Sequence, residues 1–506
     1  MNKKFIYIFL ISLLFKPIWL FNLGSLDNEG DDLSYWLHSA TLAYDFDLDY
    51  SNDYFSNGET FDQVTNAPSH PPGAGFAAAP FVFTFQYLDI LTENNIERIN
   101  PVNSYAYLGY FFSALIYCYF AFYFLNKINS VNHFQHKNLV LACAYLSTLV
   151  HFVSTRFLMA HIFEFFVVCL MVYVYEELLE KQTFKSVNLL LFTYFLLSIT
   201  RPSTFLCSLL LILIYKDKIK LSFKEVSLFI INLALFSSLY FYLSQKIYNQ
   251  NSILLNISNN NTTSQYANSF NIEWIMSGLL RIPNLFFSSS MGIIWSTPII
   301  FIGIVSIFHN KKESFKRGTI FYELLYILSF FMILLIWQGR EVAYGQRLLI
   351  GLIPFLIIKV CKNSNFNVLK LPTIIFSCIS YIGYLYFYSS SLLTLRPGKT
   401  LWGVYVSWSA ENYYINLLSS LFNAENIISL LARNIYSVNV IKFSNFRNIV
   451  NQVLERVNFS NTSIERFENL VIIYGNIDKL YIFLATIFIL IFSKKLYELF
   501  NESAPQ

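Results

Sequence analysis

The stretch SVNLLLFTYFLLSITRPSTFLCSLLLILIY, residues 186–215, decides how this chain folds. It carries a single charged side chain, Arg201, so almost all of it can lie in hydrocarbon. As one helix it would be about 45 Å long, which is too long for a hydrocarbon core of about 30 Å. Because proline breaks a helix, we predict two short membrane helices that turn at Arg201-Pro202.

The rest of the chain has the same apolar character. Of its 506 residues, 55% are hydrophobic and 13% are charged, and the mean hydropathy is +0.47. Soluble domains carry about 25% charged residues, so the composition excludes an ordinary globular protein. A net charge of +4 without a basic stripe argues against nucleic acid as a partner. The six cysteines form no CxxC pair, so they indicate neither a disulfide framework nor a zinc site.

Runs of about 20 mostly apolar residues predict the membrane helices. The predicted fold is an all-α polytopic membrane protein with about twelve transmembrane helices and juxtamembrane helices on the outer side. The predicted spans are 5–23, 102–125, 138–155, 161–178, 186–200, 203–215, 225–243, 289–308, 319–337, 347–360, 371–388 and 475–493. Residues 73–91 are also apolar, and we interpret them as a re-entrant or interfacial helix, because a further crossing would invert the later loops.

The charges in the loops predict the orientation in the membrane. The segments KDKIKLSFK (216–224) and HNKKESFKRG (309–318) are basic and belong in the cytoplasm under the positive-inside rule. Residues 24–101 hold thirteen Asp and Glu and a single Arg, so this first loop belongs outside. The N-terminal apolar run lacks a small-x-small cleavage site, which favours an uncleaved first helix. With the hairpin at Arg201-Pro202, both termini are predicted to be cytoplasmic.

Three regions follow from this organisation. Residues 1–388 form a transmembrane module that contains the first outer loop, 24–101. The mixed polar tract 389–474 is predicted to form a cap of amphipathic helices on the outer side. Residues 475–506 contain the last membrane helix and a cytoplasmic tail.

The conspicuous polar clusters all fall on the outer side in this topology. Just after the first span, Asp31 and Asp32 are followed by Tyr35. Adjacent carboxylates near an interface can share a metal, or one can act as a base whose pKa its neighbour raises; the alternative is an ordinary solvated acidic loop. His70 precedes the turn Pro71-Pro72-Gly73, where it would contact a phosphate or a hydroxyl, or serve only the turn.

A further cluster lies at the joint between two predicted spans and contains Arg156, His161 and Glu164. His161 and Glu164 are three residues apart, so they share one face of a helix. Ionisable residues near hydrocarbon are functional candidates by default, and the alternative is an Arg156–Glu164 pair that only closes the joint. Arg201 adds a positive charge on the same side, at the tip of the hairpin.

The last cluster is WQGREVAYGQR, residues 337–347. Its guanidinium groups, Arg340 and Arg347, are well shaped to bind a phosphate, and its glycines would let the backbone approach a ligand. The alternative is that these residues are ordinary interfacial anchors. Trp337 and Tyr344 complete the candidate substrate-binding residues of this segment.

The order of these motifs resembles the GT-C superfamily of membrane glycosyltransferases, which includes the protein O-mannosyltransferases and the lipid A aminoarabinose transferases. The acidic motif of the first outer loop resembles Asp31-Asp32-x-x-Tyr35. The later motifs of the superfamily resemble, in order, SHPPGAGFAAAP (69–80), RFLMAHIFE (156–164), ITRPST (199–204) and WQGREVAYGQRLLIGLIP (337–354). The resemblance covers about residues 1–360. It departs at Asp32, where mannosyltransferases have Glu, and at His70, where aminoarabinose transferases tend to have Lys, so it implies no particular sugar.

The resemblance implies a defined reaction. The donor would be a sugar on polyprenyl phosphate, and an acceptor hydroxyl of a glycan, lipid or protein would attack its anomeric carbon with inversion. Asp31 would take the proton, and Asp32 or Glu164 would orient the acceptor or a metal. Metal use varies in such enzymes, so a divalent metal stays open. The candidates to stabilise the departing phosphate are Arg201, Arg340 and Arg347, and the other candidate substrate-binding residues are Tyr35, His70, Arg156, His161, Trp337 and Tyr344.

The expected location is a bacterial inner membrane, with the active site facing the periplasm. Two other functions stay open. A transporter or flippase of lipid-linked sugars usually has internal repeats and helices broken at the bilayer midplane, whereas this sequence has no visible repeat and its break lies at an outer end. A polysaccharide polymerase or ligase would use a diphosphate donor and a large outer loop with Arg and His, and residues 389–474 contain no His.

Overall fold

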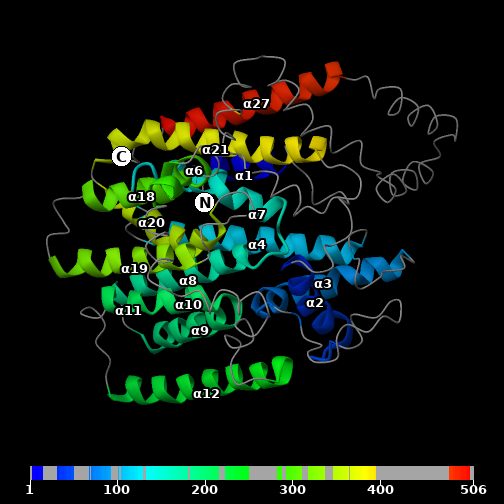
Figure 1. The fold of residues 1–506 in the computed structure, drawn as a ribbon, viewed down its shortest axis with the longest axis vertical. Coiled ribbons are helices and arrows are strands. Elements are labelled where there is room, and N and C mark those ends of the chain that lie inside the picture. Colours follow the sequence, from blue (N-terminus) through cyan, green and yellow to red (C-terminus); the bar gives the residue numbers. More distant parts are fainter. Residues whose placement is uncertain are drawn as a thin grey trace.

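Every regular element that the structure describes is a helix. The computed structural model describes residues 3–14, 31–50, 68, 70–92, 101, 104–128, 131, 133–180, 183–215, 223–249, 282–287, 292–309, 317–336, 346–363, 365–394, 417 and 478–501. Its long helices run alongside one another in a bundle, with α2 and α3 together at one side (Figure 1). The all-α fold predicted from the sequence is confirmed for these residues.

The helices follow the apolar runs of the sequence. Their bounds are α1 (Lys3–Leu14), α2 (Asp31–Ala40), η2 (Thr41–Asp45), α3 (Gly73–Leu91), α4 (Tyr105–Lys127), α6 (Lys137–Ala144), η4 (Tyr145–Leu149), α7 (Val150–Ser154), α8 (His161–Glu180), α9 (Phe184–Thr200), α10 (Pro202–Ser208), α11 (Leu210–Tyr215), α12 (Phe223–Tyr248), α16 (Ile282–Phe287), α17 (Ile293–Ser296), α18 (Pro298–His309), α19 (Arg317–Ile336), η6 (Arg347–Leu352), α20 (Ile353–Cys361), α21 (Phe366–Thr394) and α27 (Asp478–Phe500). Eleven of the predicted spans coincide with one of these helices or with two or three consecutive ones, with ends that differ by a few residues. The predicted span 5–23 is described only as far as Leu14.

Four of these helices are long and apolar enough to cross a membrane. They cover Gly73–Leu91, Tyr105–Lys127, Lys137–Ser154 and Phe366–Leu385, and shorter apolar helices accompany them. Helix α12 exposes large apolar side chains such as Ile230, Ile231 and Phe241, as expected for a helix that has lipid as its solvent. The chain is therefore built as an integral membrane protein. That all twelve predicted spans cross the membrane, and that 73–91 is re-entrant, remain predictions.

The hairpin predicted at Arg201-Pro202 is confirmed. Helix α9 ends at Thr200 and α10 begins at Pro202, while Arg201 between them has a non-helical backbone with φ −148° and ψ 83°. Pro202 is tolerated at the first position of α10 because its missing N–H would have no partner within the helix there. The hydroxyl of Tyr194 donates to the carbonyl of Ser208 at 2.8 Å. The two helices therefore fold back on one another around Arg201.

Helix α3 lies antiparallel to the first half of α4. Asp89, near the end of α3, accepts hydrogen bonds from the backbone N–H groups of Tyr105 and Ala106, each at 2.8 Å. Tyr117, in the middle of α4, donates to the carbonyl of Ala77 near the start of α3 at 2.8 Å. The turn that begins α3 is therefore placed beside the middle of α4 and not beside its end.

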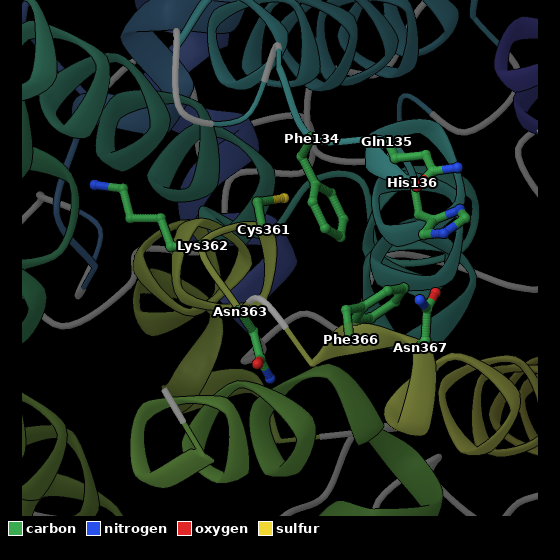
Figure 2. A pocket seen from close by; sticks show the side chains of 8 residues that line it. All are labelled: Phe134, Gln135, His136, Cys361, Lys362, Asn363, Phe366 and Asn367. Carbon is green, nitrogen blue, oxygen red and sulfur yellow. The ribbon is translucent and has the colours of Figure 1, made fainter. Parts of the chain in front are cut away.

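Ion pairs join the helices at the end of the bundle that the charge pattern predicts to be cytoplasmic. Lys362 pairs with Glu176 at 3.1 Å, and Lys359 pairs with Glu323. A cavity of about 240 Å³ lies beside Lys362 (Figure 2), and its lining consists of Phe134, Gln135, His136, Cys361, Lys362, Asn363, Phe366 and Asn367. Glu176 is twelve residues after Glu164 in α8, which corresponds to about 18 Å along the helix axis, so this cavity is remote from the predicted site.

The structure leaves the division into three regions untested. Of the predicted outer cap 389–474, it describes only the end of α21 and Leu417. The remainder of the predicted cap lies outside the described residues.

Candidate functional site

The structure places eight of the twelve predicted site residues with their side chains. These are Asp32, Tyr35, His70, Arg156, His161, Glu164, Arg201 and Arg347. Asp31 begins helix α2, but its side chain lies outside the described part of the chain, as do Trp337, Arg340 and Tyr344 entirely. Of the site residues predicted in the last cluster, the structure describes Arg347, at the first position of η6.

Asp32 and Arg156 come together from distant parts of the sequence. The Nη2 atom of Arg156 lies 3.1 Å from Oδ2 of Asp32, and about a fifth of each side chain is exposed. Arg156 belongs to the short link between α7 and α8, where its backbone N–H donates to the carbonyl of His151 at 3.0 Å. A half-buried ion pair therefore connects the start of α2 with the start of α8.

Glu164 is fully buried in the first turn of α8 and contacts three elements. Its Oε2 atom lies 3.3 Å from Nδ1 of His161 and 3.6 Å from Nε of Arg201. Its Oε1 atom accepts a hydrogen bond from the hydroxyl of Thr204, and the backbone of Gly351 packs against the same oxygen, 2.9 Å from where a Cβ atom of residue 351 would lie. The shared helix face of His161 and Glu164 is confirmed. The alternative of an Arg156–Glu164 pair is wrong, because Glu164 faces Arg201.

Two side chains from different helices hold the turn at His70. Its backbone carbonyl accepts hydrogen bonds from Nε2 of His38 and from the hydroxyl of Tyr248, both at 2.7 Å. The hydroxyl of Tyr50 lies 2.7 Å from Nδ1 of His38. The imidazole ring of His70 lies next to Tyr35, with 5.2 Å between the ring centroids. The predicted turn therefore places His70 against the helix that carries the acidic motif.

The first turn of α3 is wedged between α2 and the end of α9. A Cβ atom added at Gly75 would lie 2.5 Å from the carbonyl oxygen of Tyr35, and one at Gly73 would lie 2.9 Å from that of Ile199. Only glycine permits this approach of backbone to backbone. Because Thr200 adjoins Arg201, the wedge links the helix of Asp32 to the arginine that contacts Glu164. Pairwise contacts therefore connect four of the five predicted polar clusters.

Burial lowers the pKa of His38 to about 3. His38 is completely buried in α2, outside the membrane-spanning helices. Since Nε2 faces a carbonyl oxygen, it must carry the proton, and Nδ1 then accepts from the hydroxyl of Tyr50. His38 is therefore a neutral imidazole that donates to the turn at His70.

We expect the protein to lose stability as the pH falls below the ordinary histidine pKa of 6.5. Below pH 6.5 the unfolded chain binds a proton at His38 and the folded chain does not. The contribution of His38 to the free energy of unfolding is therefore complete above pH 6.5 and is lost progressively toward pH 3. At pH 5 the loss is about 2 kcal/mol. Thermal unfolding in detergent at pH 7.5 and pH 5, for the wild type and His38→Gln, measures it. An equal pH dependence in both proteins would contradict this role of His38.

The described residues form no metal cluster. No group of three or more His, Cys, Asp or Glu side chains within them is placed to hold a metal ion. Asp32 and Glu164 each face an arginine, which is not the surrounding of a metal ligand. We therefore derive no step through a metal.

Four residues of this site were not predicted from the sequence, namely His38, Thr204, Tyr248 and Gly351. His38 is three residues after Tyr35 on the same helix, and Thr204 is three residues after Arg201, so a search one helical turn beyond each motif would have found both. Tyr248 lies outside every motif of the sequence, and Gly351 lies inside the motif 337–354, which does not indicate its contact with Glu164. Their contacts with His70 and Glu164 come from packing between distant segments.

No protein-family model matches this chain, and no curated protein matches its sequence. Among solved structures, the oligosaccharyltransferase of Archaeoglobus fulgidus in complex with Zn and sulfate has 12% identity and a TM-score of 0.41, over 81% of this chain and 53% of that one. The archaeal oligosaccharyltransferase AglB from Archaeoglobus fulgidus, in complex with an inhibitory peptide and a dolichol-phosphate, has 11% identity and a TM-score of 0.41, over 92% and 59%. This chain spans a little over half the length of those chains, and a likeness this weak supports no conclusion about function.

Proposed function

We propose that this protein is a membrane glycosyltransferase that moves a sugar from a polyprenyl-phosphate carrier to a hydroxyl of a glycan, lipid or protein acceptor. The observation that carries the proposal is the convergence of Asp32 with Arg156, and of Glu164 with Arg201, around the turn that begins α3. Carboxylates and guanidinium groups beside apolar helices match a reaction that handles both a hydroxyl proton and a lipid phosphate.

The proposed reaction needs a base and a site for an anion. The acceptor oxygen attacks the anomeric carbon with inversion, and the bond from that carbon to the phosphate oxygen breaks. The hydroxyl proton passes to Asp31, and the carrier leaves as polyprenyl phosphate. Because the leaving group is already anionic, fixed positive charge stabilises the transition state more than a general acid would.

The arginines divide between the two substrates in this proposal. Arg201 is paired to Glu164 through Nε and keeps 18% of its side chain exposed, so its outer nitrogen atoms can reach a phosphate. Arg347 and Arg340 would bind the same phosphate. Asp32, held by Arg156, would orient the acceptor. The half-buried ring of His70, which lies beside the fully buried ring of Tyr35, would contact a hydroxyl of the sugar.

The proposed location is a bacterial inner membrane, with the site toward the periplasm and both termini in the cytoplasm. The acidic first loop and the basic later loops support this orientation. The apolar helices support an approach of the prenyl chain from the lipid, without passage of the carrier through water.

A proteoliposome assay distinguishes transfer from transport. The purified protein is reconstituted with each of a panel of labelled polyprenyl-phosphate sugars in turn, with a membrane extract as the acceptor source, and two quantities are followed. We expect free polyprenyl phosphate to accumulate. We also expect an external sugar oxidant to reach the remaining donor no faster than it does in vesicles without protein. Faster exposure without release of polyprenyl phosphate would support a flippase and overturn the proposal. A control with a polyprenyl-diphosphate sugar detects a polymerase or ligase.

A further inference from the structure

The carboxylate of Glu164 is enclosed by other groups of the protein. Three polar groups approach it, namely the Thr204 hydroxyl, the His161 ring and the Arg201 guanidinium. The backbone of Gly351 packs against its Oε1 atom. The side chain has no solvent exposure. A base must instead lie within hydrogen-bonding reach of the proton that it removes.

We propose that Glu164 is a positioning residue that sets the places of Arg201 and Arg347 in a phosphate-binding site, and that it accepts no proton from the acceptor. This inference rests on the proposed function and departs from the role that the family resemblance implies for Glu164. Its basis is the set of elements that Glu164 joins. Arg201 is the single residue between α9 and α10. Its N–H donates to the carbonyl of Leu197 at 2.8 Å and its carbonyl accepts from the N–H of Phe205 at 3.0 Å, so the two helices hold its backbone. The contact with Glu164 therefore acts on the orientation of the Arg201 side chain.

Glu164 also fixes the 3₁₀ helix η6, on which Arg347 is the first residue. Gly351 contacts Glu164 and lies four residues after Arg347, a rise of about 8 Å at 2.0 Å per residue. One buried carboxylate therefore ties both arginines to α8. Losing the charge at Glu164 would release the side chain of Arg201, and the place of η6 depends on packing against the same buried side chain.

The packing at Gly351 shows that η6 must lie close to Glu164. A Cβ atom added there would lie 2.6 Å from Cγ2 of Thr204, 2.9 Å from Oε1 of Glu164 and 3.1 Å from Cε1 of Phe330. Any larger residue would push η6 away from the carboxylate. Glycine at residue 351 therefore lets η6, which carries Arg347, pack against the same carboxylate that contacts Arg201.

Binding of undecaprenyl phosphate by the full-length protein in lipid nanodiscs tests this inference, with undecaprenol as the uncharged control ligand. We expect Glu164→Gln to weaken phosphate binding by about 10-fold or more, because Arg201 loses its charged partner. Arg201→Met should weaken it similarly, and the double variant should be no weaker than either single variant, because both changes remove the same interaction. Glu176→Gln, in the same helix but paired with Lys362, should bind like the wild type.

The dependence of the transfer rate on pH separates a positioning residue from a base. With Glu164 as a positioning residue, Glu164→Gln keeps the shape of the wild-type profile, and saturating donor restores most of the rate. If Glu164→Gln bound phosphate with unchanged affinity and its pH–rate profile lost the acidic limb, the inference would be overturned and Glu164 would be the base. If folded wild type bound undecaprenyl phosphate no better than undecaprenol, the proposed function itself would fail, and this inference with it.

The variant Thr204→Val covers the outcome in which Glu164→Gln does not fold. It removes one hydrogen bond to Glu164 and keeps the charge and the volume of the side chain. We expect it to weaken phosphate binding in the same direction and by a smaller factor. Wild-type affinity in a folded Thr204→Val protein, beside an unfolded Glu164→Gln, would assign Glu164 a purely structural role and overturn the inference.

Discussion

Replacing Asp31 by Asn is expected to lower the rate of sugar transfer by about 100-fold or more. The change keeps the size of the side chain and removes only its charge and its ability to take the hydroxyl proton. Asp31 begins α2, one residue before the Asp32–Arg156 pair that ties this helix to α8. The measurement is the initial rate of polyprenyl-phosphate release by the purified variant at saturating donor.

Asp45→Asn is the matched control for this experiment. Asp45 belongs to the same predicted loop and ends the π-helical segment that follows α2, and we assign it no role in the site. Its variant should release polyprenyl phosphate at the wild-type rate. Full activity in Asp31→Asn would remove Asp31 from the mechanism, and equal losses in both variants would mean that the general acidity of the loop matters and not one base.

Gly75→Ala is expected to lower the thermal stability of the protein and to abolish most of its transfer activity. The added methyl group would lie 2.5 Å from Cβ of His38, 2.5 Å from the carbonyl oxygen of Tyr35 and 3.0 Å from the backbone N of Ser39. Overpacking typically costs about 1–3 kcal/mol, whereas alanine gains only about 1 kcal/mol over glycine as a helix former. Because two of the three atoms belong to the backbone, they cannot move aside, and the overpacking outweighs the gain.

The loss of activity should exceed what the loss of stability explains, because α2 carries Asp31 and Asp32 and rests on this glycine. Thr84→Val is the control, since Thr84 lies on an exposed part of the same helix and bonds only within it. Unfolding temperature and transfer rate should both stay near wild type in that variant. An active and stable Gly75→Ala protein would show that α2 and α3 do not pack as closely as in this structure.

The fold was largely predictable because local composition determines where membrane helices lie. Apolar runs of sufficient length predicted the helices from α4 to α27 except α16, and a proline in the middle of a run predicted the hairpin at Arg201. An apolar run and a proline turn each depend only on residues that are neighbours in the sequence. The boundary of the predicted cap 389–474 depended on composition alone, and the structure leaves it untested.

The candidate site was predictable only where its contacts are local. His161 and Glu164 share a helix face because they are three residues apart, which the sequence states directly. The sequence did not determine which arginine pairs with Glu164. The packing of the helices places Arg201, and not Arg156, beside it. The contacts of Tyr248 with His70 and of Gly351 with Glu164 join segments more than 170 residues apart. No local pattern encodes such pairs.

The most direct test of the central claim is release of polyprenyl phosphate from a panel of polyprenyl-phosphate sugars by the purified protein, with a membrane extract as acceptor. We predict release from one donor by the wild type and transfer of its sugar to the extract with inversion at the anomeric carbon. For Asp31→Asn we predict a rate of release that is lower by about 100-fold or more. No release from any donor by a well-folded sample, or equal release by both proteins, would contradict the assignment as a glycosyltransferase.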